Sequence, residues 1–85
     1  MQVLIPTSLR SYTRVSRVEA TGATLGDVLA DIDRQFPGLR FRMVDEQDQL
    51  RPNMRVFVNG RAIRDLAVPM QPSDDVSIVQ ALSGG

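Results

Sequence analysis

The sequence predicts an α+β domain, a mixed sheet of four to five strands with one main helix packed on one face. Three observations lead to this prediction. One central segment carries apolar residues at helical spacing. Short β-prone runs lie before and after it, and turn signals separate them. No repeat or linker divides the 85 residues, a length suited to one small domain, and the apolar share of 42% is enough for a core.

The chain opens with a predicted hairpin of two strands. Residues 3–5 form a β-prone run that ends at Pro6, because proline cannot donate to a strand ladder. Residues 7–11 are expected to turn the chain away. Residues 14–20 then make the second strand. Its apolar residues are Val15, Val18 and Ala20.

The main helix is predicted from a cap and a stripe. Thr24 is a favourable N-cap, and Asp27 places negative charge in the first turn, where the helix dipole favours it. The apolar stripe consists of Leu25, Val28, Leu29, Ile32 and Phe36. The residues expected to face solvent are Asp27, Asp31, Asp33 and Arg34, and Pro37-Gly38 ends the helix. We predict that the stripe joins the core, since so short a helix needs packing to persist; a partner-binding helix is the alternative.

Two segments after the helix have weaker signals. Residues 39–44 fit either a short helical turn or extended chain, and we favour the helical turn. Residues 45–49 are a polar loop with three acids. The loop lacks the glycine and final glutamate of a calcium-binding loop, so we interpret it as solvated surface and predict no metal site.

A second hairpin follows. Residues 54–58 alternate and lead into Asn59-Gly60, which favours a type I′ turn because both central residues of that turn need positive φ. Residues 61–64 make the return strand.

The alternation in this hairpin also predicts a partner-binding surface. If Val56 and Val58 face the core, Phe57 points to the opposite face of the sheet. We interpret Phe57 as an interface anchor; ordinary exposed apolar surface is the alternative. Its predicted neighbours in this surface are Leu82, Arg55 and Arg64.

The last strand determines where the chain ends. Residues 66–72 are an irregular connection, residues 73–75 a turn, and residues 76–79 the final strand. Parallel pairing of the first and last strands would place the end of the chain at the end of a central strand, which is the ubiquitin-like β-grasp topology. We therefore predict a β-grasp domain over residues 1–81 and a flexible Gly-Gly tail over residues 82–85.

The composition disfavours several kinds of function. The chain has no cysteine and no histidine, so the usual nucleophile, general base and transition-metal ligands are missing, and an independent enzyme is disfavoured. Ten basic and ten acidic residues give no net charge, which argues against nucleic-acid binding. We find no signal peptide and no apolar run of membrane-spanning length, and we expect a cytoplasmic protein.

The final residues carry the chemistry that the rest of the chain lacks. Glycine has no Cβ, so Gly84-Gly85 can lie in a narrow channel, and the Gly85 carboxylate is unhindered. A free carboxylate is a poor electrophile, but adenylation would convert it into an acyl donor. A frayed terminus is the alternative, although two final glycines arise by chance in only about one chain in two hundred.

Several pieces of the sequence, in their order, resemble the ThiS/MoaD family of sulfur-carrier proteins, in which a β-grasp domain ends in Gly-Gly. The pieces are residues 5–10, 23–29, 56–60 and 74–85. The Ile-Pro-Thr opening and the Ile-Val-Gln-Ala-Leu-Ser-Gly-Gly close look most like the sulfur carrier of the thiocarboxylate-dependent cysteine pathway. The molybdopterin synthase small subunit is less similar, because its tail usually has two prolines where this chain has Gln80-Ala81.

The resemblance implies a protein cosubstrate that binds no cofactor of its own and is not an enzyme. An E1-like activating enzyme would use ATP and Mg²⁺ to adenylate Gly85, and sulfide or a persulfide would displace AMP to leave a thiocarboxylate. Ser83 and Gly84 would enter the partner's active site with Gly85. A sulfur-accepting synthase of the cysteine synthase type would take the sulfur, and a metalloprotease is a further candidate partner. Carriers for molybdopterin or thiamine, a ubiquitin-like modifier and a plain interaction domain are the alternatives.

Overall fold

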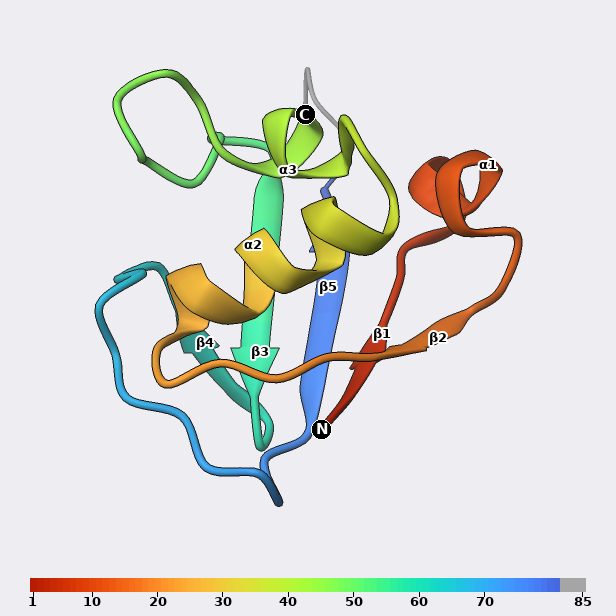
Figure 1. Ribbon diagram of the computed structural model, residues 1–85. Helices are drawn as coiled ribbons and strands as arrows, with labels where there is room; N and C mark the ends of the chain where they lie inside the picture. Colours follow the sequence, from red (N-terminus) through yellow and green to blue (C-terminus); the bar gives the residue numbers. More distant parts are fainter. Residues whose placement is uncertain (82–85) are drawn as a thin grey trace.

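One mixed sheet carries the fold, with its strands in the order β2-β1-β5-β3-β4 (Figure 1). The computed structural model describes residues 1–81. The elements are β1 (Gln2–Leu4), η1 (Thr7–Leu9), α1 (Arg10–Thr13), β2 (Arg17–Glu19), α2 (Leu25–Gln35), α3 (Leu39–Met43), β3 (Met54–Val58), β4 (Arg61–Ile63) and β5 (Val76–Gln80). The predicted α+β class and the short helical turn over residues 39–44 are confirmed.

The last strand, β5, lies in the middle of the sheet. On one side it runs parallel to β1, where Val3 pairs with Val76 and Leu4 with Ser77. On its other side it runs antiparallel to the whole of β3. Because β1 and β5 are parallel, their carboxyl ends lie at the same end of the sheet, opposite the β3–β4 turn (Figure 1).

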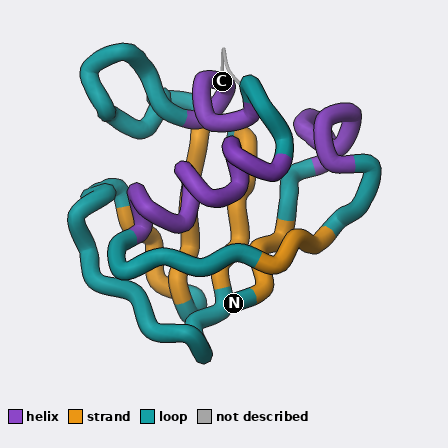
Figure 2. Tube along the Cα trace, in the orientation of Figure 1, coloured by secondary structure: helices purple, strands orange, loops and turns teal. Residues whose placement is uncertain are grey.

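Helix α2 crosses one face of the sheet and supplies the middle of the core (Figure 2). The Thr24 side chain accepts a hydrogen bond from the Asp27 N–H at 3.2 Å, which is the predicted N-cap. The stripe residues without exposed surface are Leu25, Val28, Leu29 and Ile32. Burying each of these side chains contributes roughly 1.5–3 kcal/mol, so packing against the sheet, more than helix propensity, holds α2 in place.

The segment after β1 is helical, and the prediction of a turn there was wrong. Helix η1 begins directly after Pro6, and α1 ends at Thr13, followed by the C-cap Arg14, whose φ of 62° is left-handed. Because Arg14 ends a helix, the second strand starts later than predicted and β2 is only three residues long. Val15 is accordingly 49% exposed, whereas Val18 and Ala20 are buried.

The β3–β4 turn is the hairpin that Asn59-Gly60 predicted, with φ values of 52° and 81°. Asn59 also fastens this turn to the start of β5. Its side-chain amide donates to Asp74 at 2.9 Å and accepts from the Asp75 N–H at 2.9 Å. The Gln71 N–H, and secondly the Asn59 amide, lower the pKa of Asp74.

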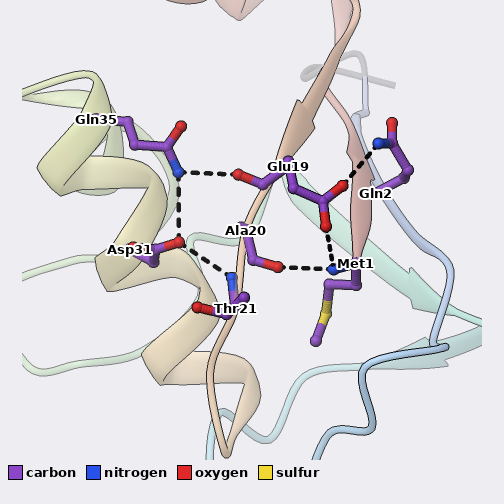
Figure 3. A network of polar contacts seen from close by, with 7 residues as sticks. All are labelled: Met1, Gln2, Glu19, Ala20, Thr21, Asp31 and Gln35. Carbon is purple, nitrogen blue, oxygen red and sulfur yellow. Dashed lines mark hydrogen bonds and ion pairs between the residues drawn. The ribbon is translucent and has the colours of Figure 1, made fainter.

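A polar network joins the start of β1 to β2 and α2 (Figure 3). The Met1 ammonium donates to the Glu19 carboxylate at 2.8 Å and to the Ala20 carbonyl at 2.9 Å. The Asp31 carboxylate accepts from the Thr21 N–H at 3.0 Å. The prediction that Asp31 faces solvent was therefore wrong: it is 8% exposed, because it closes the β2–α2 connection against the helix.

The network predicts a pH dependence of stability. The hydrogen bond from the Met1 ammonium is the largest cause that lowers the pKa of Glu19 below its ordinary 4.5. Since folding lowers this pKa, the contact stabilises the fold fully above the ordinary value, and the stabilisation is lost as the pH falls through the lowered value. We expect Glu19→Gln to lower the free energy of unfolding near neutral pH and to differ less from the wild type at about pH 3.

Urea unfolding at the two pH values measures this difference. Glu46→Gln is the matched control, because Glu46 is an exposed loop acid. It should follow the wild type at both values. A deficit for Glu19→Gln that is equally large in acid and near neutrality would contradict the assignment.

Candidate functional site

The carboxyl end of β5 leads into the predicted sulfur-carrying tail. Gln80 ends the strand, and the N–H of Ala81 donates to the Asn53 carbonyl at 2.7 Å. The predicted tail residues Leu82, Ser83, Gly84 and Gly85 lie outside the described residues. The main chain is therefore hydrogen-bonded on the β3 side as far as Ala81, immediately before the tail.

A groove of about 530 Å³ lies between this end of β5 and the segment that follows β1. Residues 4–8 and Arg10 line one wall, and residues 78–81 line the other. The Ser8 hydroxyl donates to the Gln80 side chain and joins the walls. Arg10 donates through Nε to the Ile5 carbonyl at 3.0 Å. The groove thus combines apolar walls with one fixed guanidinium beside the start of the tail.

The sheet face away from α2 carries a row of small and apolar side chains. Paired residues on neighbouring strands share a face, so the register defines the row. It consists of Leu4, Ser77, Phe57 and Ala62, and it ends at the exposed Arg17 of β2, which pairs with Leu4. Val79, which is 42% exposed, lies opposite Arg55 in the next row toward the tail. Phe57 points away from the helices as predicted. Its side chain is half-buried, so it is less exposed than the prediction of an interface anchor assumed.

The two arginines predicted to lie in this surface brace the segment before β3. Arg64 follows β4, and its guanidinium donates to the carbonyls of Leu50 at 2.6 Å and Met54 at 3.0 Å. Arg55 donates to the same Met54 carbonyl at 3.0 Å. Each guanidinium therefore has a structural role. Their contribution to partner binding stays a prediction.

The most exposed aromatic residue in the described chain is Phe41, which the sequence analysis did not select. It lies on α3 and is 56% exposed. Leu39 and Met43 of the same helix are fully buried, so the residue midway between them points away from the core. That spacing was the available signal, but it has meaning only once residues 39–44 are known to be helical.

In the acidic loop over residues 45–49, one carboxylate stabilises the backbone turn of the loop itself. The Asp45 carboxylate accepts from the N–H groups of Gln47 at 2.8 Å and Gln49 at 3.0 Å. Within residues 1–81, no three side chains of the metal-binding types are grouped so that they could hold an ion. None of the helices in that part of the chain has the length and apolar character needed to cross a membrane.

Comparison with known proteins decides the family. The ThiS family model matches residues 3–85. The chain belongs to the ThiS family. The sulfur carrier protein CysO of Mycobacterium tuberculosis is 34% identical over 89 aligned positions, which cover 98% of this chain and 96% of the relative. Small archaeal modifier protein 3 of Haloferax volcanii is 33% identical over 66 positions, which cover 74% of this chain and 71% of the relative.

Solved structures of such relatives have the same fold. A chain of the Amycolatopsis orientalis BexX/CysO complex superposes with a TM-score of 0.91 at 33% identity, covering 99% of this chain and 98% of that one. The crystal structure of Mycobacterium tuberculosis CysO gives a TM-score of 0.89 at 32% identity, with coverage of 95% and 98%. The ubiquitin-like β-grasp prediction is confirmed.

The row on the open sheet face can be tested by truncation. We expect Phe57→Ala to weaken binding to the activating enzyme that the resemblance implies by about tenfold, because it removes the largest side chain of the row. Isothermal titration calorimetry measures the affinity, and thermal melting verifies the fold. Leu66→Ala is the control, since Leu66 is also half-buried but packs beside Gly26 of α2. Equal affinities of Phe57→Ala and the wild type would remove this row from the interface.

Proposed function

We propose that this protein is a sulfur carrier whose Gly85 carboxylate is the working chemical group. The observation that carries the proposal is the ThiS family match over residues 3–85, which includes the Gly-Gly end. The near full-length identity to a protein named a sulfur carrier supports it. The position of β5 agrees with it, since the strand that precedes the tail is central and ends at one end of the sheet.

In the proposed chemistry the chain is a cosubstrate. A carboxylate oxygen of Gly85 attacks the α-phosphorus of ATP in an activating enzyme, and pyrophosphate leaves. Sulfide then attacks the carbonyl carbon of the acyl adenylate. The new C–S bond replaces the C–O bond to AMP, so the products are AMP and a thiocarboxylate. No residue of this chain gains or loses electrons, and Mg²⁺ and ATP belong to the partner.

Biosynthesis of cysteine is the destination we propose for the sulfur. The CysO relatives align with nearly the whole chain, which supports this destination. A sulfur-accepting synthase of the cysteine synthase type would then be the second partner, with a metalloprotease as a candidate third. One solved relative forms a complex with BexX, which supports the use of a protein partner by this chain as well.

Intact-mass measurement tests the proposal. The chain is incubated with its adenylating enzyme, ATP, Mg²⁺ and sulfide, and we expect a species heavier by the difference between one sulfur and one oxygen. Fragmentation should place the change on Gly85, and deletion of Gly85 should abolish it. Glu46→Gln is the control and should react like the wild type. A wild-type chain that keeps only its carboxylate while the enzyme consumes no ATP would contradict the proposal.

A ubiquitin-like modifier is the second candidate function. The observation that favours it is the similarity to the small archaeal modifier protein of Haloferax volcanii. Such a modifier would use the same activation but pass the acyl group to a lysine of another protein. Tagged chain should then recover covalent conjugates from cells, and these should disappear when Gly85 is deleted.

A further inference from the structure

Phe41 and Arg51 form a fixed pair on the helical side of the molecule. The Arg51 guanidinium lies over the Phe41 ring, 4.6 Å from its centre. Arg51 also donates through Nε to the Phe41 carbonyl at 2.8 Å. A cation over an aromatic face is attracted by the ring's quadrupole, and the second contact fixes the side chain. The exposed ring is therefore held in one position before any partner arrives.

This pair borders the place from which the tail departs. A cavity of about 280 Å³ opens beside it, between η1, α3 and the end of β5. Its lining residues are Leu9, Phe41, Arg42, Arg51, Asn53 and Gln80. Asn53 accepts the hydrogen bond from Ala81, the last described residue. Figure 1 shows α3 and the carboxyl end of β5 at the same end of the molecule.

The surface formed by Phe41, Arg42 and Arg51 is cationic. Within residues 1–81, neither arginine forms an ion pair. Two of the three acids of the neighbouring loop are used elsewhere, since Asp48 pairs with Arg40 and the Asp45 carboxylate accepts two backbone N–H groups; the third, Glu46, is exposed. Guanidinium groups with free N–H donors bind carboxylates in a bidentate manner. The Phe41 surface, meaning these three residues, therefore fits a partner that offers carboxylates beside an apolar side chain.

The length of the tail limits where that partner can lie. The four residues after Ala81 reach at most about 14 Å when fully extended. An enzyme that acts on Gly85 must place the mouth of its active site within that distance of Ala81. The Phe41 surface lies at this end of the molecule, and its two arginines add positive charge beside an exposed aromatic ring.

We propose that the Phe41 surface is a second docking surface and that it receives an acidic segment of the adenylating enzyme, at the rim of the active site that the tail enters. The inference rests on the sulfur-carrier function proposed above. It adds a partner chemistry, which is carboxylates beside an apolar group, and a location separate from the Phe57 row. Two surfaces on either side of the tail would fix the direction in which Gly85 is presented.

Charge reversal tests the proposal. Arg42→Glu is the main variant, because the Arg42 side chain makes no hydrogen bond or ion pair within residues 1–81, so we expect its replacement to leave the fold intact. We expect it to weaken binding of the full 85-residue chain to the adenylating enzyme by about tenfold, and Phe41→Ala to have a similar effect. Arg61→Glu is the matched control, since it makes the same charge change on β4 near the opposite end of the sheet. It should bind like the wild type.

Further measurements separate the possible outcomes. Arg51→Lys keeps the charge but loses the planar group over the ring, and it should bind less tightly than the wild type. Raising the salt concentration should weaken the wild type more than Arg42→Glu. If the wild type forms the thiocarboxylate while Arg42→Glu and Phe41→Ala bind as tightly as it does, the docking proposal is overturned and the carrier function stands. If the wild type is neither bound nor adenylated, both proposals fail.

Discussion

The parallel pairing of β1 with β5 is the constraint on which the rest of the structure depends. It joins the first and last strands through Val3–Val76 and Leu4–Ser77. Parallel strands cannot be connected by a tight turn, so the helices and the β3–β4 hairpin together form the crossover between them. One consequence is that β5 has neighbours on both sides, although it is the last strand within residues 1–81. The other is that its carboxyl end leaves the sheet from a central position.

This arrangement fits a protein whose chemistry takes place on its main-chain end. A carrier needs the strand before its tail to stay in place when a partner enzyme binds the tail. A central strand meets this need, because it opens only when much of the domain unfolds. A carrier also needs surfaces by which partners recognise it. The open sheet row and the Phe41 surface are the two surfaces we propose for this, one on each side of the sheet, and neither requires a reactive side chain. The lack of cysteine and histidine is then no obstacle to function.

The sequence predicted those parts in which several local signals agree. The N-cap, the apolar stripe and Asn59-Gly60 each act over a few residues, so α2 and the second hairpin were predictable. Asp31 was misplaced because its partner, the Thr21 N–H, comes from a connection that local periodicity does not describe. The Gly-Gly end could be recognised from the sequence alone. The docking surface on α3 could not, because the exposure of Phe41 depends on how a five-residue helix packs.

Amide hydrogen exchange, measured by NMR, tests most directly whether β5, the strand that precedes the tail, is among the most stable parts of the domain. The account predicts that the hydrogen-bonded amides of β5 exchange only through global unfolding, with a free energy of opening equal to that measured by denaturant, and that the edge strands β2 and β4 open at lower free energy. If the β5 amides exchange at a lower free energy of opening than those of the edge strands, β5 opens locally without global unfolding. That result would contradict the account.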